Sequence, residues 1–184
     1  MRIVLASGSP RRVALLGTVY EDFDVEKSDV DETTSLTDGV SVAKELALRK
    51  ARAVAIRRPN DIVIGADTSV WLGDVQYGKP IDRADAIRIL TELNGKVHCV
   101  ITGVAVVCGE RFLSDACVSQ VKMTWTPQEI EQYVDEYAPY DKAGAYGLQE
   151  FGDAHATYSG EYDNIVGLPV AMTQRLVKSM EEMV

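Results

Sequence analysis

The chain has 184 residues, 46% of them apolar, which is enough to bury a core and predicts one domain over residues 1–184. Its 28 acidic and 19 basic residues give a net charge of −9, which argues against broad, charge-driven binding to nucleic acid or to an anionic membrane. Three cysteines without a CxxC pair, and no apolar run of about 18 residues, predict a soluble cytoplasmic protein with free thiols.

The N-terminal stretch has the pattern of a phosphate site. A short apolar run, Ile3–Ala6, leads through Ser7 and Gly8 to a helix that Ser9 can cap, with Pro10 at the first helical position. Arg11 and Arg12 then fall in the first turn, where the helix dipole disfavours cations. A phosphate held between the arginines and the free N–H groups would explain them. The alternative is a capped surface helix whose arginines face solvent or carboxylates.

An acidic stretch follows the first helix and a short predicted strand at residues 23–25. Asp29, Asp31 and Glu32 place three carboxylates within four residues. Such oxygen ligands suit Mg²⁺, although a solvated loop has the same composition. The sequence leaves both interpretations open.

The next predicted helix runs from a Ser41 cap to about Arg57. Lys50 falls in the middle of its apolar face, among residues such as Leu46, Ala47 and Val54. A lysine at such a position either extends its ammonium past the edge of the core or points into a cleft as a phosphate ligand.

The apolar run Ile62–Ile64 predicts a buried strand, and Asp67 stands at or near its predicted end. A carboxylate there needs a cation, a metal or several hydrogen bonds, and N–H groups of a following turn are the simplest source of the last. A predicted hairpin over residues 70–77, with Gly73 and Asp74 in its turn, returns Lys79 toward Asp67.

The second half alternates further helices and strands. The pattern predicts a helix from Asp82 or Asp85 to Asn94, a long strand over 97–107 in which His98 is packed, and a strand around 121–125. A capping box at Thr126 starts another helix, and Gly167-Leu168-Pro169 opens the last one. Residues 141–149 read as a loop in which Gln149 either contacts a nucleotide base or lies on the surface, and residues 150–163 as a polar segment without regular structure.

Together these residues suit a metal-bound polyphosphate. Lysine, arginine and Mg²⁺ neutralise phosphate oxygens while a carboxylate positions or deprotonates a water. No serine or cysteine with a paired histidine is evident, so attack by water is favoured over a covalent intermediate.

Several motifs together resemble the Maf family of nucleoside triphosphate pyrophosphatases. They are residues 5–12 (LASGSPRR), 65–68 (GADT), 78–80 (GKP), 102–103 (TG), 141–147 (DKAGAYG) and 166–169 (VGLP). The resemblance implies an α/β fold like that of inosine triphosphate pyrophosphatases, in which a mixed, elongated sheet flanked by helices encloses a central cleft. It also implies a homodimer, and cleavage between the α and β phosphates of a nucleoside triphosphate substrate with Mg²⁺ or Mn²⁺.

The resemblance also assigns roles by position. The residues that match the phosphate-contacting positions are Ser7, Arg11, Arg12, Lys50 and Lys79. Asp67 matches the proposed general base, and Glu32 its acidic partner, so these two carboxylates are the candidates to hold the metal.

Base selection follows from the same comparison of motifs. Thr68 and the segment 141–149 resemble the branch that acts on dTTP and UTP rather than on 7-methyl-GTP, which makes Arg12, Thr68 and Gln149 the candidates for base selection. Arg49 departs from the pattern, because relatives often carry an acidic residue there. The rival hypothesis is a regulator of cell division that senses a nucleotide without hydrolysing it.

Overall fold

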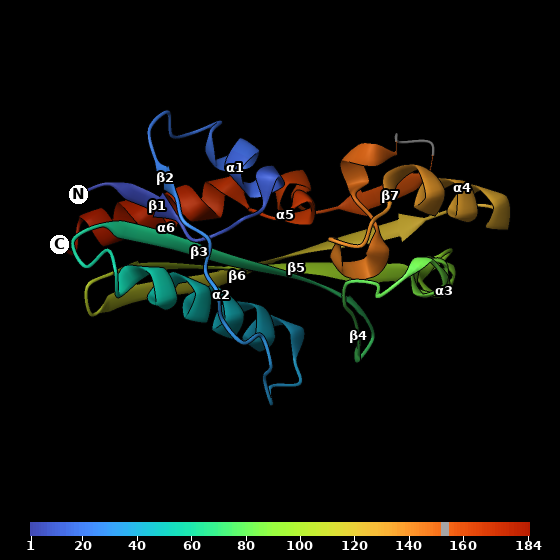
Figure 1. The fold of residues 1–184 in the computed structure, drawn as a ribbon, viewed down its shortest axis with the longest axis horizontal. Helices are drawn as coiled ribbons and strands as arrows, with labels where there is room; N and C mark the ends of the chain where they lie inside the picture. The colour runs from blue at the N-terminus through green and yellow to red at the C-terminus, as the bar shows by residue number, and fades with distance from the viewer. Residues whose placement is uncertain (152–154) are drawn as a thin grey trace.

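The computed structural model describes residues 1–151 and 155–184. It contains a mixed sheet of seven strands in the order β2-β1-β3-β5-β6-β7, with β4 paired to β3. The strands are β1 (Ile3–Leu5), β2 (Asp24–Val25), β3 (Ile62–Leu72), β4 (Val75–Tyr77), β5 (Val97–Cys108), β6 (Arg111–Met123) and β7 (Ala156–Ser159). Three long antiparallel strands, β3, β5 and β6, run the length of the molecule and give the elongated shape in Figure 1.

Helices cover both faces of the sheet. They are α1 (Pro10–Leu16), α2 (Gly39–Ala55), α3 (Arg83–Leu93), α4 (Pro127–Tyr137), α5 (Tyr162–Val166) and α6 (Val170–Glu181), with 3₁₀ turns η1 (Ala143–Ala145) and η2 (Leu148–Glu150). In Figure 1, α2 lies on one face, α1 and α6 lie on the other, and α3 and α4 stand at the end away from the termini. The predicted mixed α/β architecture is therefore confirmed. In the described part of the chain, no helix is long and apolar enough to cross a membrane.

The caps of the helices follow local chemistry. The capping box of α4 is present, with Thr126 and Glu129 each accepting from the other's backbone N–H. The predicted Ser41 cap of α2 is wrong, because α2 begins two residues earlier: Asp38 is the N-cap, and its Oδ1 accepts from the N–H of Ser41 at 2.9 Å. Ser9 stands at the N-cap position of α1, but its side chain makes no capping hydrogen bond.

β3 is longer than predicted, and this changes the position of Asp67. The strand continues beyond Ile64 because residues 65–71 pair with β5, with Asp67 opposite Gly103. Asp67 is therefore in mid-strand, and its prediction at a strand end is wrong. On the other edge of β3, β1 pairs with Ile62–Ile64 and β4 with Val70–Leu72. Residues 65–69 lie between these two partners, and the functional side chains of β3 come from this interval.

Residues 150–163 also contain more regular structure than predicted. β7 pairs with Gln120–Met123 of β6, and α5 begins at Tyr162. Residues 152–154 of this segment lie outside the described residues.

Two glycines allow α2 to lie directly on the sheet. A Cβ on Gly103 would stand 2.2 Å from the carbonyl oxygen of Ala43, and one on Gly65 would stand 2.3 Å from that of Ala47. Since the obstructing atoms belong to the helix backbone, a side chain could be accommodated only by moving α2. These glycines thus set the distance at which Lys50 of α2 reaches Asp67.

We expect Gly103→Ala to lower the free energy of unfolding by about 3 kcal/mol, at the upper end of the usual cost of overpacking. Gly78→Ala is the matched control, because a Cβ there would meet nothing within 4 Å. Urea denaturation of the two variants measures the difference. A Gly103→Ala protein as stable as the control would contradict the close approach of α2.

His98 is packed, as predicted. It is 1% exposed, and its Nε2 lies 2.8 Å from the hydroxyl of Tyr146. Burial lowers the pKa of His98 to about 4. The imidazole is therefore neutral in the folded protein across the physiological range.

His98 should make stability depend on pH below neutrality. An unfolded histidine titrates near pH ~6.5, so between that value and about 4 the unfolded chain binds one more proton than the folded one. Stability is complete above this window and falls as the pH drops through it, by about 3 kcal/mol for this residue. His98→Gln, which cannot be protonated, should gain that amount relative to wild type between pH 7 and pH 4 in urea denaturation. If the unfolding free energies of His98→Gln and wild type changed in parallel with pH, the prediction would be contradicted.

Candidate active site

A polar cleft opens beside residues 65–69 of β3. It consists of two adjoining cavities that share seven lining residues: Ser9, Arg11, Arg12, Glu32, Lys50, Lys79 and Asp141. One cavity continues along the N-terminal loop at Ser7 and Gly8. The other continues toward a more apolar wall that includes Val70, Val100 and Tyr146. The cleft therefore has a cationic part and a part suited to a flat, partly apolar group.

The nine residues singled out from the sequence come from six separate segments and all line this cleft. They are Ser7, Arg11, Arg12, Glu32, Lys50, Asp67, Thr68, Lys79 and Gln149. Their side chains come from the strand β3, the helices α1 and α2, the 3₁₀ turn η2, and the loops after β1, before α2 and after β4. The structure places them; their individual roles remain predictions.

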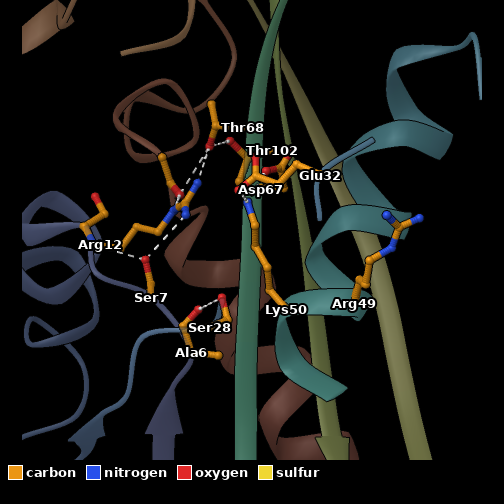
Figure 2. A network of polar contacts seen from close by, with 12 residues as sticks. Ala6, Ser7, Arg12, Ser28, Glu32, Arg49, Lys50, Asp67, Thr68 and Thr102 are labelled. Carbon is orange, nitrogen blue, oxygen red and sulfur yellow. Dashed lines mark hydrogen bonds and ion pairs between the residues drawn. The ribbon is translucent and has the colours of Figure 1, made fainter. Parts of the chain in front are cut away.

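Lys50 is the centre of the charged part of the cleft. Its Nζ lies 2.6 Å from Oδ1 of Asp67 and 3.0 Å from Oε1 of Glu32, and Figure 2 shows it reaching from α2 toward both carboxylates. Lys50 is 9% exposed and Asp67 is 6% exposed. The ammonium therefore points into the cleft rather than past the core. The simpler expectation for Asp67, N–H bonds from a following turn, is wrong because its described partner is Lys50.

Glu32 is held ionised by the cations around it. Burial raises the pKa of its carboxyl, but the hydrogen bond and charge of Lys50, with the charges of Lys79 and Arg12, outweigh burial and lower the pKa overall. Linkage then makes the ionised Glu32 stabilising above its ordinary pKa, and this contribution is lost as the pH falls through its lowered value. Glu32 is therefore a carboxylate at neutral pH, and it contacts the same lysine as Asp67.

The rest of the acidic stretch does not join the site. Oδ1 of Asp31 accepts from the N–H of Thr33 at 2.8 Å, and Arg49 donates to the carbonyl oxygens of Asp31 and Thr33. Arg49 thus fastens the loop that carries Glu32 to α2. Within residues 1–151 and 155–184, no group of three or more His, Cys, Asp or Glu side chains is arranged to hold a metal. A three-carboxylate site at residues 29–32 is therefore not formed.

Arg12 is held by hydrogen bonds to other parts of the protein. Its Nε donates to the carbonyl oxygen of Gly167 at 2.8 Å, and its Nη2 donates to Oγ1 of Thr68 at 3.1 Å (Figure 2). A longer contact of 3.5 Å joins Nη1 to Oγ of Ser7, which also accepts from the N–H of Ser9. Burial lowers the pKa of Arg12, and the charge of Asp67 opposes that change.

Comparison with known proteins identifies the family of this chain. The family described as Maf-like protein matches residues 2–180. The chain belongs to the Maf family. A protein of Desulforamulus reducens named dTTP/UTP pyrophosphatase is 43% identical over 92% of this chain and 91% of its own length. One of the same name from Dictyoglomus turgidum is 44% identical over 95% of this chain and 94% of its own.

A solved structure supports the fold assignment. The Ham1 protein of Staphylococcus aureus aligns with a TM-score of 0.51 over 67% of this Maf chain and 72% of that protein, at 17% identity. At 17% sequence identity, the similarity supports a shared fold and nothing more. It agrees with the elongated mixed sheet of this Maf protein.

An ion-pair chain on the far side of the cleft was not predicted. Nη1 of Arg11 lies 2.8 Å from Oδ2 of Asp141, whose Oδ1 lies 3.1 Å from Nζ of Lys142. Lys142 is 8% exposed and its Nζ also lies 2.9 Å from Oε1 of Glu150. Glu150 contacts the hydroxyl of Tyr133, which accepts from the N–H of Gly147. These contacts fix the loop that carries Gln149, and residue spacing gave no signal for them.

A second unpredicted network lies behind Thr68 in this Maf protein. Oγ1 of Thr68 lies 3.0 Å from Oγ1 of Thr102, which donates to the carbonyl oxygen of Asn164 at 2.9 Å. Nδ2 of Asn164 donates to Val100 and Ser119. Thr102 is 0% exposed in the middle of β5. In the sequence, Thr102 stood out only as part of the motif 102–103 and as a hydroxyl within an apolar strand, which also fits an ordinary buried threonine.

Proposed function

We propose that this chain is a nucleoside triphosphate pyrophosphatase that hydrolyses dTTP and UTP to the nucleoside monophosphate and pyrophosphate. Membership of the Maf family and the relatives named dTTP/UTP pyrophosphatase support the activity. The observation that carries the proposal is the buried pair of Asp67 and Lys50, with Glu32 on the same ammonium, beside two arginines.

The cationic part of the cleft binds the triphosphate. Arg11, Arg12, Lys50 and Lys79 border the same space, and the hydroxyl of Ser7 lines its inner end. Because the chain as a whole is acidic, this local cluster provides the attraction for an anion that the net charge does not. The fork of Arg12 is already oriented, so little conformational entropy is lost when phosphate oxygens bind.

We assign the role of general base to Asp67. Its carboxylate lines the cleft, and the hydrogen bond from Lys50 leaves further lone pairs for a water. A carboxylate so oriented takes the proton of a water that attacks the α phosphorus, while the P–O bond to the β phosphate breaks and pyrophosphate leaves with that electron pair. Lys50 orients the base and neutralises phosphate charge as the transition state forms.

Glu32 and Asp67 would hold the divalent metal, Mg²⁺ or Mn²⁺. The donor type fits, because both side chains are carboxylates that contact the same lysine ammonium in the cleft, and Mg²⁺ is usually bound by one or two carboxylates together with substrate phosphates. When bound, the metal supplies charge neutralisation at the phosphate oxygens.

The base occupies the less polar part of the cleft. Val70, Val100 and Tyr146 offer apolar surface to a pyrimidine ring, and Thr68 and Gln149 offer hydrogen bonds at the same cavity. We also propose that the protein acts in the cytoplasm and that it is a homodimer. The family resemblance implies the homodimer, and light scattering tests it.

Pyrophosphate release from a nucleotide panel tests the function. The purified protein is assayed with Mg²⁺ and dTTP, UTP, CTP, GTP or 7-methyl-GTP. We expect turnover led by dTTP and UTP. Turnover led by 7-methyl-GTP would overturn the specificity, and binding of triphosphates without release would favour the nucleotide-sensing regulator.

A further inference from the structure

We propose that Thr102 is a positioning residue that makes Thr68 an acceptor-only contact in the cleft, so that the site selects bases presenting an N–H group at Thr68. The inference rests on the proposed function, because it concerns which nucleotide the cleft accepts. It follows from the count of hydrogens in the network that joins Arg12, Thr68, Thr102 and Asn164.

The carbonyl oxygen of Asn164, at the buried end of this network, determines the direction of each hydrogen bond. A carbonyl oxygen only accepts, so Thr102 must use its single hydroxyl hydrogen on the carbonyl of Asn164, 2.9 Å away. The contact of 3.0 Å between Thr68 and Thr102 can then be made only with Thr68 as donor. Thr68 and Thr102 are direct cross-strand partners on β3 and β5, so the sheet register holds this contact in place.

For a hydrogen bond to a ligand, the hydroxyl of Thr68 therefore has only one lone pair left. Its hydrogen is used on Thr102, and one lone pair accepts from Nη2 of Arg12 at 3.1 Å. The other possible acceptor for the hydrogen, the carbonyl oxygen of Gly167, lies 3.5 Å away and already accepts from Nε of Arg12. In either arrangement the hydrogen stays within the protein, and a ligand atom at Thr68 must be a donor.

This polarity distinguishes the pyrimidines. Uracil and thymine carry a hydrogen on N3, whereas N3 of cytosine is an acceptor. The N3–H of uracil or thymine can donate to an acceptor-only Thr68. The N3 of cytosine has no hydrogen to donate and stays without a partner, which costs binding free energy in a buried site. Figure 2 shows Thr102 beside Thr68, joined to it by a dashed line, on the side away from Arg12.

Binding of non-hydrolysable nucleotides tests the proposal apart from turnover. Dissociation constants of the α,β-methylene analogues of UTP and CTP are measured for wild type, Thr102→Val and Thr102→Ser. Removing the hydroxyl frees the hydrogen of Thr68 to face the cleft, so we expect Thr102→Val to reduce the preference for UTP over CTP about five- to tenfold. Thr102→Ser keeps the hydroxyl and should keep the preference.

A double-mutant cycle separates positioning from a structural role. In a Thr68→Val background, Thr102→Val should leave the preference unchanged, because the group through which it acts is gone. An equal loss of affinity for both nucleotides, an unchanged preference, or an effect that persists without the Thr68 hydroxyl would each overturn the proposal. Selective binding without pyrophosphate release would instead overturn the proposed function alone.

Wild-type protein gives an independent measurement if Thr102→Val does not fold. The N3-methyl form of the UTP analogue lacks the donor and should bind at least about tenfold more weakly than the parent. The 5-methyl form keeps the donor and should bind like the parent. Equal affinity for the N3-methyl form would overturn the proposal.

Discussion

Asp67→Asn is expected to lower kcat for dTTP by about 10³-fold, within the range that a general base contributes. The amide has nearly the same shape as the carboxylate but does not accept a proton from water. Because the arginines and Lys79 remain in the cleft, we expect the dissociation constant of a non-hydrolysable dTTP analogue to change by less than about threefold. Steady-state kinetics and equilibrium binding of the same preparation provide both values.

The matched control is Asp74→Asn, the same substitution at an exposed position in the turn between β3 and β4. It should leave kcat and KM unchanged. An Asp67→Asn enzyme with normal kcat and a raised KM would contradict the role of Asp67 as base, since that pattern indicates a contact made equally in the ground and transition states.

Lys50→Met is expected to reduce both stability and activity. It leaves Asp67, which is 6% exposed, without its cation, and breaking a buried ion pair from one side costs about 3–5 kcal/mol. Thermal or urea unfolding measures that loss. Activity should fall by about 10²-fold or more, because the variant neither orients Asp67 nor neutralises phosphate.

Two further variants show that the unpaired carboxylate causes the instability. Lys44→Met makes the same change elsewhere on α2, at a lysine without an ion pair among the described residues, and should alter stability by less than about 0.5 kcal/mol. Lys50→Met combined with Asp67→Asn removes the uncompensated charge and should recover at least half of the loss. A double variant as unstable as Lys50→Met would show that packing of the lysine stem, and not charge, is responsible.

The sequence predicted the parts of the fold that depend on local chemistry. The capping box at Thr126, the long strand that includes His98 and the hairpin after Val70 are all present, because caps, apolar runs and two-residue turns act over a few residues. It placed Asp67 at a strand end because Asp67 and Thr68 interrupt the apolar pattern. Pairing with β5 extends the strand through them, and such tertiary pairing is not visible in a local window.

The candidate site was predicted where residue types were unusual for their position. Two arginines in a first helical turn and a lysine on an apolar face signalled a ligand, and these residues line the cleft. Thr102 and Lys142 entered only as members of the family motifs, without a predicted role, and Asn164 gave no signal. Each is polar and buried, and each is satisfied mainly by partners far along the chain, so only the folded arrangement reveals its contacts.

Identification of the products of dTTP hydrolysis tests the central claim most directly. Wild-type protein with Mg²⁺ and dTTP is followed by phosphorus NMR, which separates pyrophosphate from inorganic phosphate and dTMP from dTDP. The arrangement of Asp67, Lys50 and Glu32 beside the arginines predicts dTMP and pyrophosphate in equal amounts from the first turnover. Formation of dTDP and inorganic phosphate, or unchanged dTTP that is nevertheless bound, would contradict it.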